Sequence, residues 1–72
     1  MKGYILIEVS INGKITKLEN DTNIKQMINI LNYKSKLYAV AINTTFISIN
    51  KYEITIIKQG DTIDILAPIQ GG

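Results

Sequence analysis

The dipeptide Asn12-Gly13 constrains the fold of this chain more than any other short feature. A two-residue type I′ turn needs positive φ at both central residues, and Asn followed by Gly meets that need best. Before it, from Tyr4 to Ile11, apolar residues fall at every second position, which is typical of a strand with one buried face. After it, Lys14 to Leu18 reads as the returning strand. The sequence therefore predicts an N-terminal β-hairpin. The residues expected on its buried face in the first strand are Ile5, Ile7, Val9 and Ile11.

A helix is predicted next, over about Asn23 to Asn32. Its apolar residues recur at positions i, i+3, i+4 and i+7, which places them on one helical face. They are Ile24, Met27, Ile28 and Leu31. Asn23 is expected to be the N-cap, and Gln26 stands three residues later, where a capping box needs a side-chain acceptor.

Three further strands are predicted in the second half of the chain. They cover Tyr38–Asn43, Phe46–Ile49 and Thr62–Leu66. A turn at Thr44-Thr45 would separate the first two. The segment Asn50–Ile57 is expected to be irregular or to contain one helical turn. Lys58–Asp61 is expected to be a turn in which Gly60 supplies conformational freedom and Asp61 a side-chain acceptor.

The element order is then β-β-α-β-β-β, which predicts an α+β fold. One helix would pack across one face of a mixed sheet of four to five strands, as in the ubiquitin-like β-grasp. The N-terminal hairpin and the last strand should sit centrally because they are the most apolar. Residues 1–66 would form this domain, and residues 67–72 a C-terminal tail, because Pro68 cannot donate to a sheet ladder.

Composition excludes several classes of function. The chain has 72 residues, 46% of them hydrophobic, and has neither cysteine nor histidine. Disulfides, thiolate metal sites and histidine-based catalysis are therefore excluded. The net charge of +2 comes from eight scattered lysines without arginine, which does not suggest a nucleic-acid interface. No apolar run is long enough to span a membrane. We expect a cytoplasmic protein that is monomeric when free and binds no metal or cofactor.

The chain ends in Pro68-Ile69-Gln70-Gly71-Gly72, and this tail, taken together with the predicted fold, indicates a function. A β-grasp domain ending in Gly-Gly resembles the ubiquitin-like sulfur carriers of the MoaD/ThiS family. The resemblance covers nearly the whole chain and is closest to ThiS, the carrier of thiamine biosynthesis. It is carried by the INGK hairpin, the helix NIKQMINIL, VAIN, KQGDTIDIL and the terminal PIQGG.

The resemblance implies a carrier and not an enzyme. A ThiF-type adenylating enzyme would activate the Gly72 carboxylate with ATP and Mg²⁺. A persulfide sulfur donor would then displace AMP and leave a thiocarboxylate. A thiazole synthase of the ThiG type would take the sulfur. Gly71 and Gln70 would thread the tail into a partner, since glycine lets two backbones approach closely.

Two surface features are predicted to serve partner contacts. Leu66, Pro68 and Ile69 would form an apolar collar at the base of the tail, because Leu66 alternates out of phase with the buried residues of the last strand. The small side chains of Ala39 and Ala41 would leave room for a partner on the same outer face.

Other functions remain open on the sequence alone. The small subunit of molybdopterin synthase has the same fold and a terminal thiocarboxylate, but it commonly shows a Pro-Pro pair where Pro68 stands alone here. A ubiquitin-like modifier would join Gly72 to lysines of target proteins. A plain binding module would not need Gly71 and Gly72.

Overall fold

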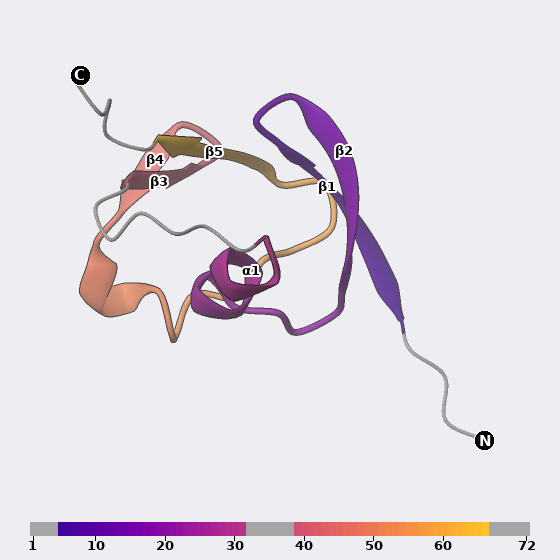
Figure 1. Ribbon diagram of the computed structural model, residues 1–72, viewed down its shortest axis with the longest axis horizontal. Helices are drawn as coiled ribbons and strands as arrows, with labels where there is room; N and C mark the ends of the chain where they lie inside the picture. Colours follow the sequence, from indigo (N-terminus) through magenta and orange to yellow (C-terminus); the bar gives the residue numbers. More distant parts are fainter. Residues whose placement is uncertain (1–4, 32–38, 67–72) are drawn as a thin grey trace.

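The computed structural model of the protein describes residues 5–31 and 39–66, and this part of the chain forms one sheet with one α-helix (Figure 1). The elements are β1 (Leu6–Ile11), β2 (Lys14–Glu19), α1 (Ile24–Ile30), β3 (Ala39–Ile42), β4 (Thr45–Ile47), the 3-10 helix η1 (Ile49–Lys51) and β5 (Thr62–Leu66).

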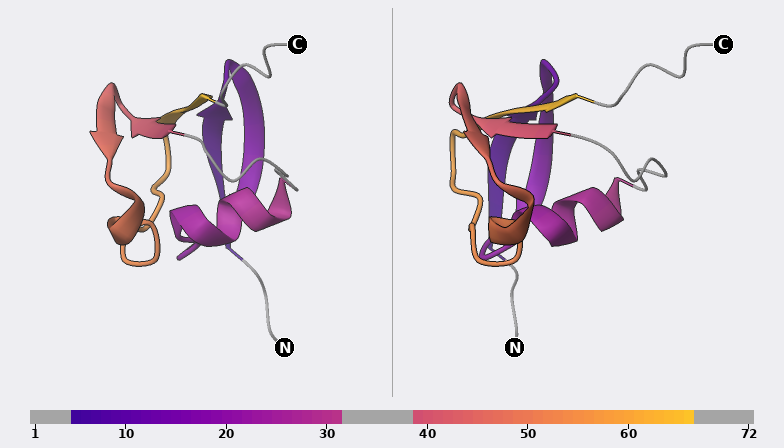
Figure 2. Two further views of the ribbon diagram at one scale, coloured as in Figure 1. Left: turned by 60° about the vertical axis from the view of Figure 1, so that its left-hand side comes forward. Right: turned by 90° about the vertical axis from the view of Figure 1, so that its left-hand side faces the viewer.

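The sheet has five strands in the order β2-β1-β5-β3-β4. β1 and β5 run parallel, and the other neighbouring pairs are antiparallel. α1 lies across one face of this mixed sheet (Figure 2). The α+β, β-grasp prediction is therefore confirmed. The expectation that the whole N-terminal hairpin is central is wrong for β2, which lies at the edge with only Leu18 buried.

The first hairpin forms as predicted. Asn12 and Gly13 have φ of 50° and 85°, and Ile11 pairs with Lys14 across the turn. Glycine reaches such a φ without the cost that a Cβ would bring. Ile7, Val9 and Ile11 are buried as expected. Ile5 has the same phase but is 69% exposed, because it precedes β1 and lies beyond the cover of the core.

The second hairpin turns one residue earlier than predicted. Asn43 and Thr44, with φ of 51° and 72°, form the turn instead of Thr44-Thr45. Ile42 then pairs with Thr45, so that β4 runs from Thr45 to Ile47. The prediction that this strand reaches Ile49 is wrong, because η1 starts there. Asn43 decides the turn because Asn adopts positive φ far more readily than Thr.

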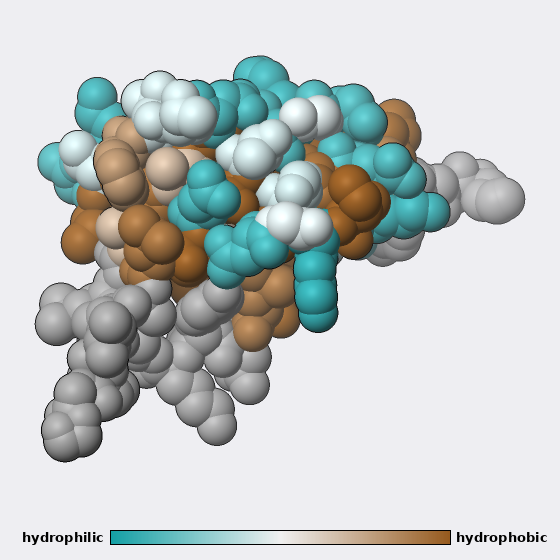
Figure 3. Space-filling model, turned by 90° about the horizontal axis from the view of Figure 1, so that it is seen from above, coloured by the Kyte–Doolittle hydropathy of each residue, from teal (hydrophilic) through white to brown (hydrophobic). Residues whose placement is uncertain are grey.

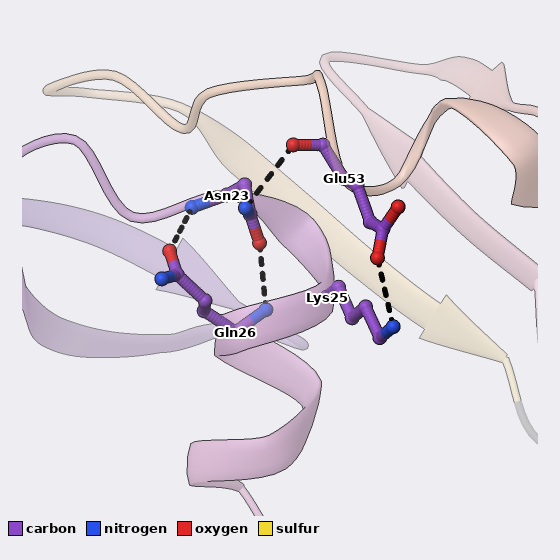
Figure 4. A network of polar contacts seen from close by, with 4 residues as sticks. All are labelled: Asn23, Lys25, Gln26 and Glu53. Carbon is purple, nitrogen blue, oxygen red and sulfur yellow. Dashed lines mark hydrogen bonds and ion pairs between the residues drawn. The ribbon is translucent and has the colours of Figure 1, made fainter.

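Helix α1 begins with the predicted capping box (Figure 4). The Asn23 side chain accepts a hydrogen bond from the Gln26 backbone N–H at 2.8 Å. The Gln26 side chain in turn accepts from the Asn23 backbone N–H at 2.9 Å. Ile24, Met27 and Ile28 are buried. The helix ends at Ile30, and its predicted last residue, Asn32, lies outside the described residues.

The segment after β4 packs against the start of α1, as both views in Figure 2 show. The Ile24 backbone N–H donates to the Thr55 carbonyl at 3.2 Å, and the Ile57 N–H donates to the Thr22 carbonyl at 2.9 Å. Tyr52 is buried in this segment. The sequence predicted irregular chain or one helical turn over Asn50–Ile57, and the short helix η1, which starts one residue earlier, is that turn. The buried core that results comprises Ile7, Val9, Ile11, Leu18, Ile24, Met27, Ile28, Val40, Tyr52, Ile57, Ile63 and Ile65.

The turn at Lys58–Asp61 places β5 beside β1. Gly60 has φ of 85°, and the Asp61 carboxylate accepts from the Lys58 backbone N–H at 2.8 Å, both as predicted. The Gly60 N–H donates to the Glu8 carbonyl at 2.8 Å. The turn is therefore already bonded to β1 before β5 begins, and β5 enters the centre of the sheet.

Candidate functional site

Five of the six residues predicted to form the functional site follow β5 in the sequence. They are Pro68, Ile69, Gln70, Gly71 and Gly72, and they lie outside the described residues. Their roles stay predictions. The sixth, Leu66, is the last residue of β5. The described fold therefore shows how the chain is held at the point where it leads into the other five.

Leu66 lies on the face of the sheet away from α1. It pairs with Ala39 of β3, while Ile63 and Ile65 of the same strand are buried under the helix. Successive side chains of a strand point to opposite faces, so Leu66 must leave the core face. It is 55% exposed. A large apolar side chain is thus available at the base of the predicted tail.

Phe46 extends this apolar surface across the sheet. It pairs with Ala41 of β3 and is 64% exposed. Ala39 and Ala41 are two residues apart on β3 and share its outer face. We call Ala39, Ala41, Phe46 and Leu66 the outer-face patch. In Figure 3, which views the molecule from above, hydrophobic surface lies at the left, on the side where Figure 1 shows β3, β4 and β5.

The expected role of the two alanines needs correction. Ala41 is only 4% exposed, because it lies inside the sheet with Phe46 on one side and Asp64 on the other. Ala39 is half-buried. The surface that a partner can contact comes mainly from the larger residues Phe46 and Leu66. The sequence did not indicate Phe46, because its place on the outer face depends on the turn between β3 and β4 and on the register in which these two strands pair.

The end of β5 is held on its other side by Asn12. The Asn12 Oδ1 accepts a hydrogen bond from the Ile65 backbone N–H at 2.8 Å. The Asn12 Nδ2 donates to the Ile65 carbonyl at 3.3 Å. The sequence indicated Asn12 only as a turn residue. Its second role links residues 53 positions apart and has no signal in a local pattern.

Asn43 has the matching place at the start of β5. Its Oδ1 accepts from the Thr62 backbone N–H at 3.0 Å, and its Nδ2 donates to the Asp61 carboxylate at 3.0 Å. Each hairpin turn thus begins with an asparagine whose amide binds β5 or the turn before it. The two asparagines hold opposite ends of the strand that leads to Gly72.

Asp64 borders the outer-face patch, because it pairs with Ala41 and shares the outer face of β5 with Leu66. The ion pair between Lys25 and Glu53 lies apart from the patch. Lys25 Nζ and Glu53 Oε2 are 2.8 Å apart at the start of α1, on the helix side of the sheet (Figure 4). The hydrogen bond from Lys25, together with its positive charge, lowers the pKa of Glu53. Among residues 5–31 and 39–66, no group of three or more His, Cys, Asp or Glu side chains is arranged to bind a metal ion. No helix in the described part of the chain is long and apolar enough to cross a membrane.

Comparison with known proteins gives one family. The model of the ThiS family matches residues 8–72, which is most of the chain. No curated protein matches the sequence.

One solved structure supports the same fold. The crystal structure of the thiamine biosynthesis protein ThiS from Geobacter metallireducens superposes with a TM-score of 0.79 at 20% sequence identity. The superposition covers 92% of this chain and 100% of that one. At this identity the likeness establishes the β-grasp fold, and the family match carries the relationship.

Proposed function

The chain belongs to the ThiS family of small sulfur carriers, which are not catalysts, and from this premise we propose that it carries sulfur on the Gly72 carboxylate for thiazole formation in thiamine biosynthesis. The observation that carries the proposal is the extent of the family match. It continues through residue 72 and so includes Gly71 and Gly72. The β-grasp fold supports the proposal, because its central strand β5 leads directly to these residues.

The proposed chemistry needs two partners at the Gly72 carboxylate. A free carboxylate is a poor electrophile, so a ThiF-type enzyme would convert it to an acyl adenylate with ATP and Mg²⁺, releasing pyrophosphate. A persulfide would attack the acyl carbon and displace AMP. A thiol would then cleave the resulting S–S bond and leave the thiocarboxylate. A ThiG-type thiazole synthase would accept the sulfur and return the carboxylate.

Partner recognition is proposed for the apolar surface at the end of β5. Leu66 exposes a large apolar side chain there, and Phe46 exposes another on the same face of the sheet, on β4. Apolar anchors in the centre of an interface commonly supply most of its affinity. Pro68 and Ile69 would extend this surface towards the carboxylate. The carrier would work as a monomer that visits the activating enzyme and the synthase in turn.

The proposal is tested by intact-protein mass spectrometry. The chain would be incubated with a ThiF-type enzyme, ATP, Mg²⁺ and a persulfide donor, beside a variant that lacks Gly72. We expect a mass increase matching replacement of one oxygen by sulfur in the full chain and none in the variant. No mass change, with an enzyme that converts its own carrier, would refute the sulfur-carrier function.

The same sample separates the alternatives. Thiazole formed after addition of a thiazole synthase supports the thiamine function, which the family match favours over the molybdopterin one. Sulfur transfer only to a molybdopterin-synthase large subunit would reverse that assignment. Discrete ATP-dependent conjugates of higher mass in cell extract would indicate a protein modifier.

A further inference from the structure

β1 and β5 do not end together. β1 stops at Ile11, where the chain turns back into β2, but β5 continues to Leu66. Their parallel pairing covers Ser10 with Thr62 and Ile11 with Ile63. The last backbone bond between them runs from the Asn12 N–H to the Ile63 carbonyl at 2.9 Å. Beyond it, no strand among residues 5–31 and 39–66 lies opposite the Ile65 N–H and carbonyl on the β1 side of β5.

The Asn12 side chain takes the place of that missing strand. A primary amide carries one acceptor oxygen and an N–H donor, as a peptide group does. Its oxygen accepts from the Ile65 N–H at 2.8 Å, and its nitrogen donates to the Ile65 carbonyl at 3.3 Å. Buried backbone groups in proteins nearly always have such partners. Asn12 thereby supplies the hydrogen bonds that a longer strand β1 would make with Ile65.

This arrangement fixes the direction in which β5 ends. On its opposite edge the strand pairs with β3, in a register that places Val40 opposite Ile65 and Ala39 opposite Leu66. With Asn12 on one edge and β3 on the other, the end of β5 is held from both edges. Without the Asn12 amide, β3 alone would hold the end of β5 within the described part of the chain.

We infer that Asn12 is a positioning residue for sulfur loading: its amide clamps Ile65 and so pre-orders the end of β5 that presents the Gly72 carboxylate to the activating enzyme. The inference rests on the proposed function. A pre-ordered segment loses less conformational freedom on binding. The Asn12 amide should therefore lower the KM for the carrier and leave the rate of chemistry on bound carrier nearly unchanged.

Asn12→Gly and Asn43→Gly form a matched pair of variants. Both asparagines occupy the first position of a two-residue turn at positive φ, which glycine adopts without strain. Both lose side-chain hydrogen bonds to the last segment of the sheet, but those of Asn12 reach the end of β5 and those of Asn43 reach its start. A loss of stability should affect both variants. A loss of positioning should affect only Asn12→Gly.

The experiment measures ATP–pyrophosphate exchange by a ThiF-type enzyme while the carrier concentration is varied, at a temperature where both variants are folded. We expect Asn12→Gly to raise the KM for the carrier by about tenfold, as the loss of hydrogen bonds to a buried peptide would. Its kcat should stay within about twofold, and Asn43→Gly should resemble the unchanged protein in both constants. Amide hydrogen exchange should show faster exchange of the Ile65 N–H in Asn12→Gly but not in Asn43→Gly.

The outcomes separate the two levels of the proposal. Unchanged KM in Asn12→Gly, or equal changes in both variants, would overturn the positioning role while leaving the carrier function in place. An unchanged exchange rate at Ile65 in Asn12→Gly would overturn the clamp itself. If the unsubstituted chain supports no pyrophosphate exchange with a competent enzyme, the carrier function fails, and the positioning role fails with it.

Discussion

Thr44 adopts a backbone conformation that β-branched residues rarely take. Its φ is 72°, at the second position of the turn between β3 and β4. Such a conformation costs a non-glycine residue about 1–3 kcal/mol. Gly13 occupies the equivalent position of the first hairpin, where the same conformation causes no strain. The second hairpin therefore forms in spite of its turn residue, through the pairing of β3 with β4 and β5.

Thr44→Gly should stabilise the protein. Relief of the strain exceeds the extra backbone entropy of glycine in the unfolded chain, which costs about 0.4–1 kcal/mol. We expect a net gain of about 1 kcal/mol in the free energy of unfolding, and a rise of roughly 4–8 °C in melting temperature. Thermal unfolding followed by circular dichroism measures it. Thr45→Gly, one residue later and inside β4, is the control and should destabilise. A lower melting temperature for Thr44→Gly would contradict the strain.

Glu53 is expected to make stability depend on pH. Lys25 lowers the pKa of Glu53 in the folded protein, so the folded form binds fewer protons than the unfolded form as the pH falls. The contribution is therefore complete above the ordinary carboxyl pKa of about 4.3 and is lost as the pH falls through the lower, folded value. Both side chains are well exposed, so salt should weaken it too.

Glu53→Gln tests this direction by urea unfolding at pH 7 and at pH 3. The variant should be less stable than the unsubstituted protein at pH 7, and the difference should shrink at pH 3, where Glu53 in the unfolded chain is protonated. Lys25→Gln should behave in the same way. A difference that is larger at pH 3 would show that the carboxylate is not stabilised by Lys25.

Helix α1 is too short to form without its surroundings. It has seven residues, whereas isolated helices below about 12–15 residues are marginal in water. Its stability comes from the capping box and from the burial of Ile24, Met27 and Ile28. Asn23 contributes more than the cap, since its Nδ2 also donates to the Glu53 carbonyl at 3.1 Å. The cap thus joins the helix to the segment that follows η1.

Asn23→Ala should lower the free energy of unfolding by about 1–2 kcal/mol, at the upper end for an N-cap, because both functions are lost together. Chemical denaturation measures it. Asn29→Ala is the matched control, since Asn29 is exposed within the helix and alanine favours helix formation. That control should stay within about 0.5 kcal/mol. Equal losses in the two variants would show that the cap contributes nothing specific.

Elements encoded by a local pattern could be predicted from the sequence. Asn12-Gly13, the capping box and the alternation in β5 each depend on neighbouring residues, and each was found in its expected place. Elements that depend on distant partners were placed less well. The edge position of β2, for example, follows from β5 lying next to β1. The second turn was placed one residue late for a local reason instead, since Asn43 readily adopts the positive φ that the first turn position needs.

At the scale of the whole molecule, the candidate site has two parts of different origin. The tail could be recognised in the sequence, because a terminal Gly-Gly after a β-grasp pattern is a linear signal. The outer-face patch and the Asn12 hydrogen bonds could not be recognised, because the strand order β2-β1-β5-β3-β4 alone brings Asn12 to the end of β5 and Phe46 to the outer face next to β3. The position of Leu66 outside the core was predictable, since a period of two settles it.

The outer-face patch should matter for partner binding and not for folding. Leu66 is 55% exposed, so an aspartate there remains hydrated and removes little buried surface. In a complex, however, it would bring an unpaired charge into an apolar contact. Leu66→Asp should weaken binding to the adenylating enzyme by about tenfold to thirtyfold, the range of an interface anchor, with the melting temperature nearly unchanged.

Ile15→Asp is the control. Ile15 is 72% exposed on the same outer face but lies on the edge strand β2, away from the patch. Titration calorimetry measures both affinities. Equal affinities for the two variants would place the contact elsewhere on the sheet, and a marked loss of stability in Leu66→Asp would show that Leu66 serves the fold instead.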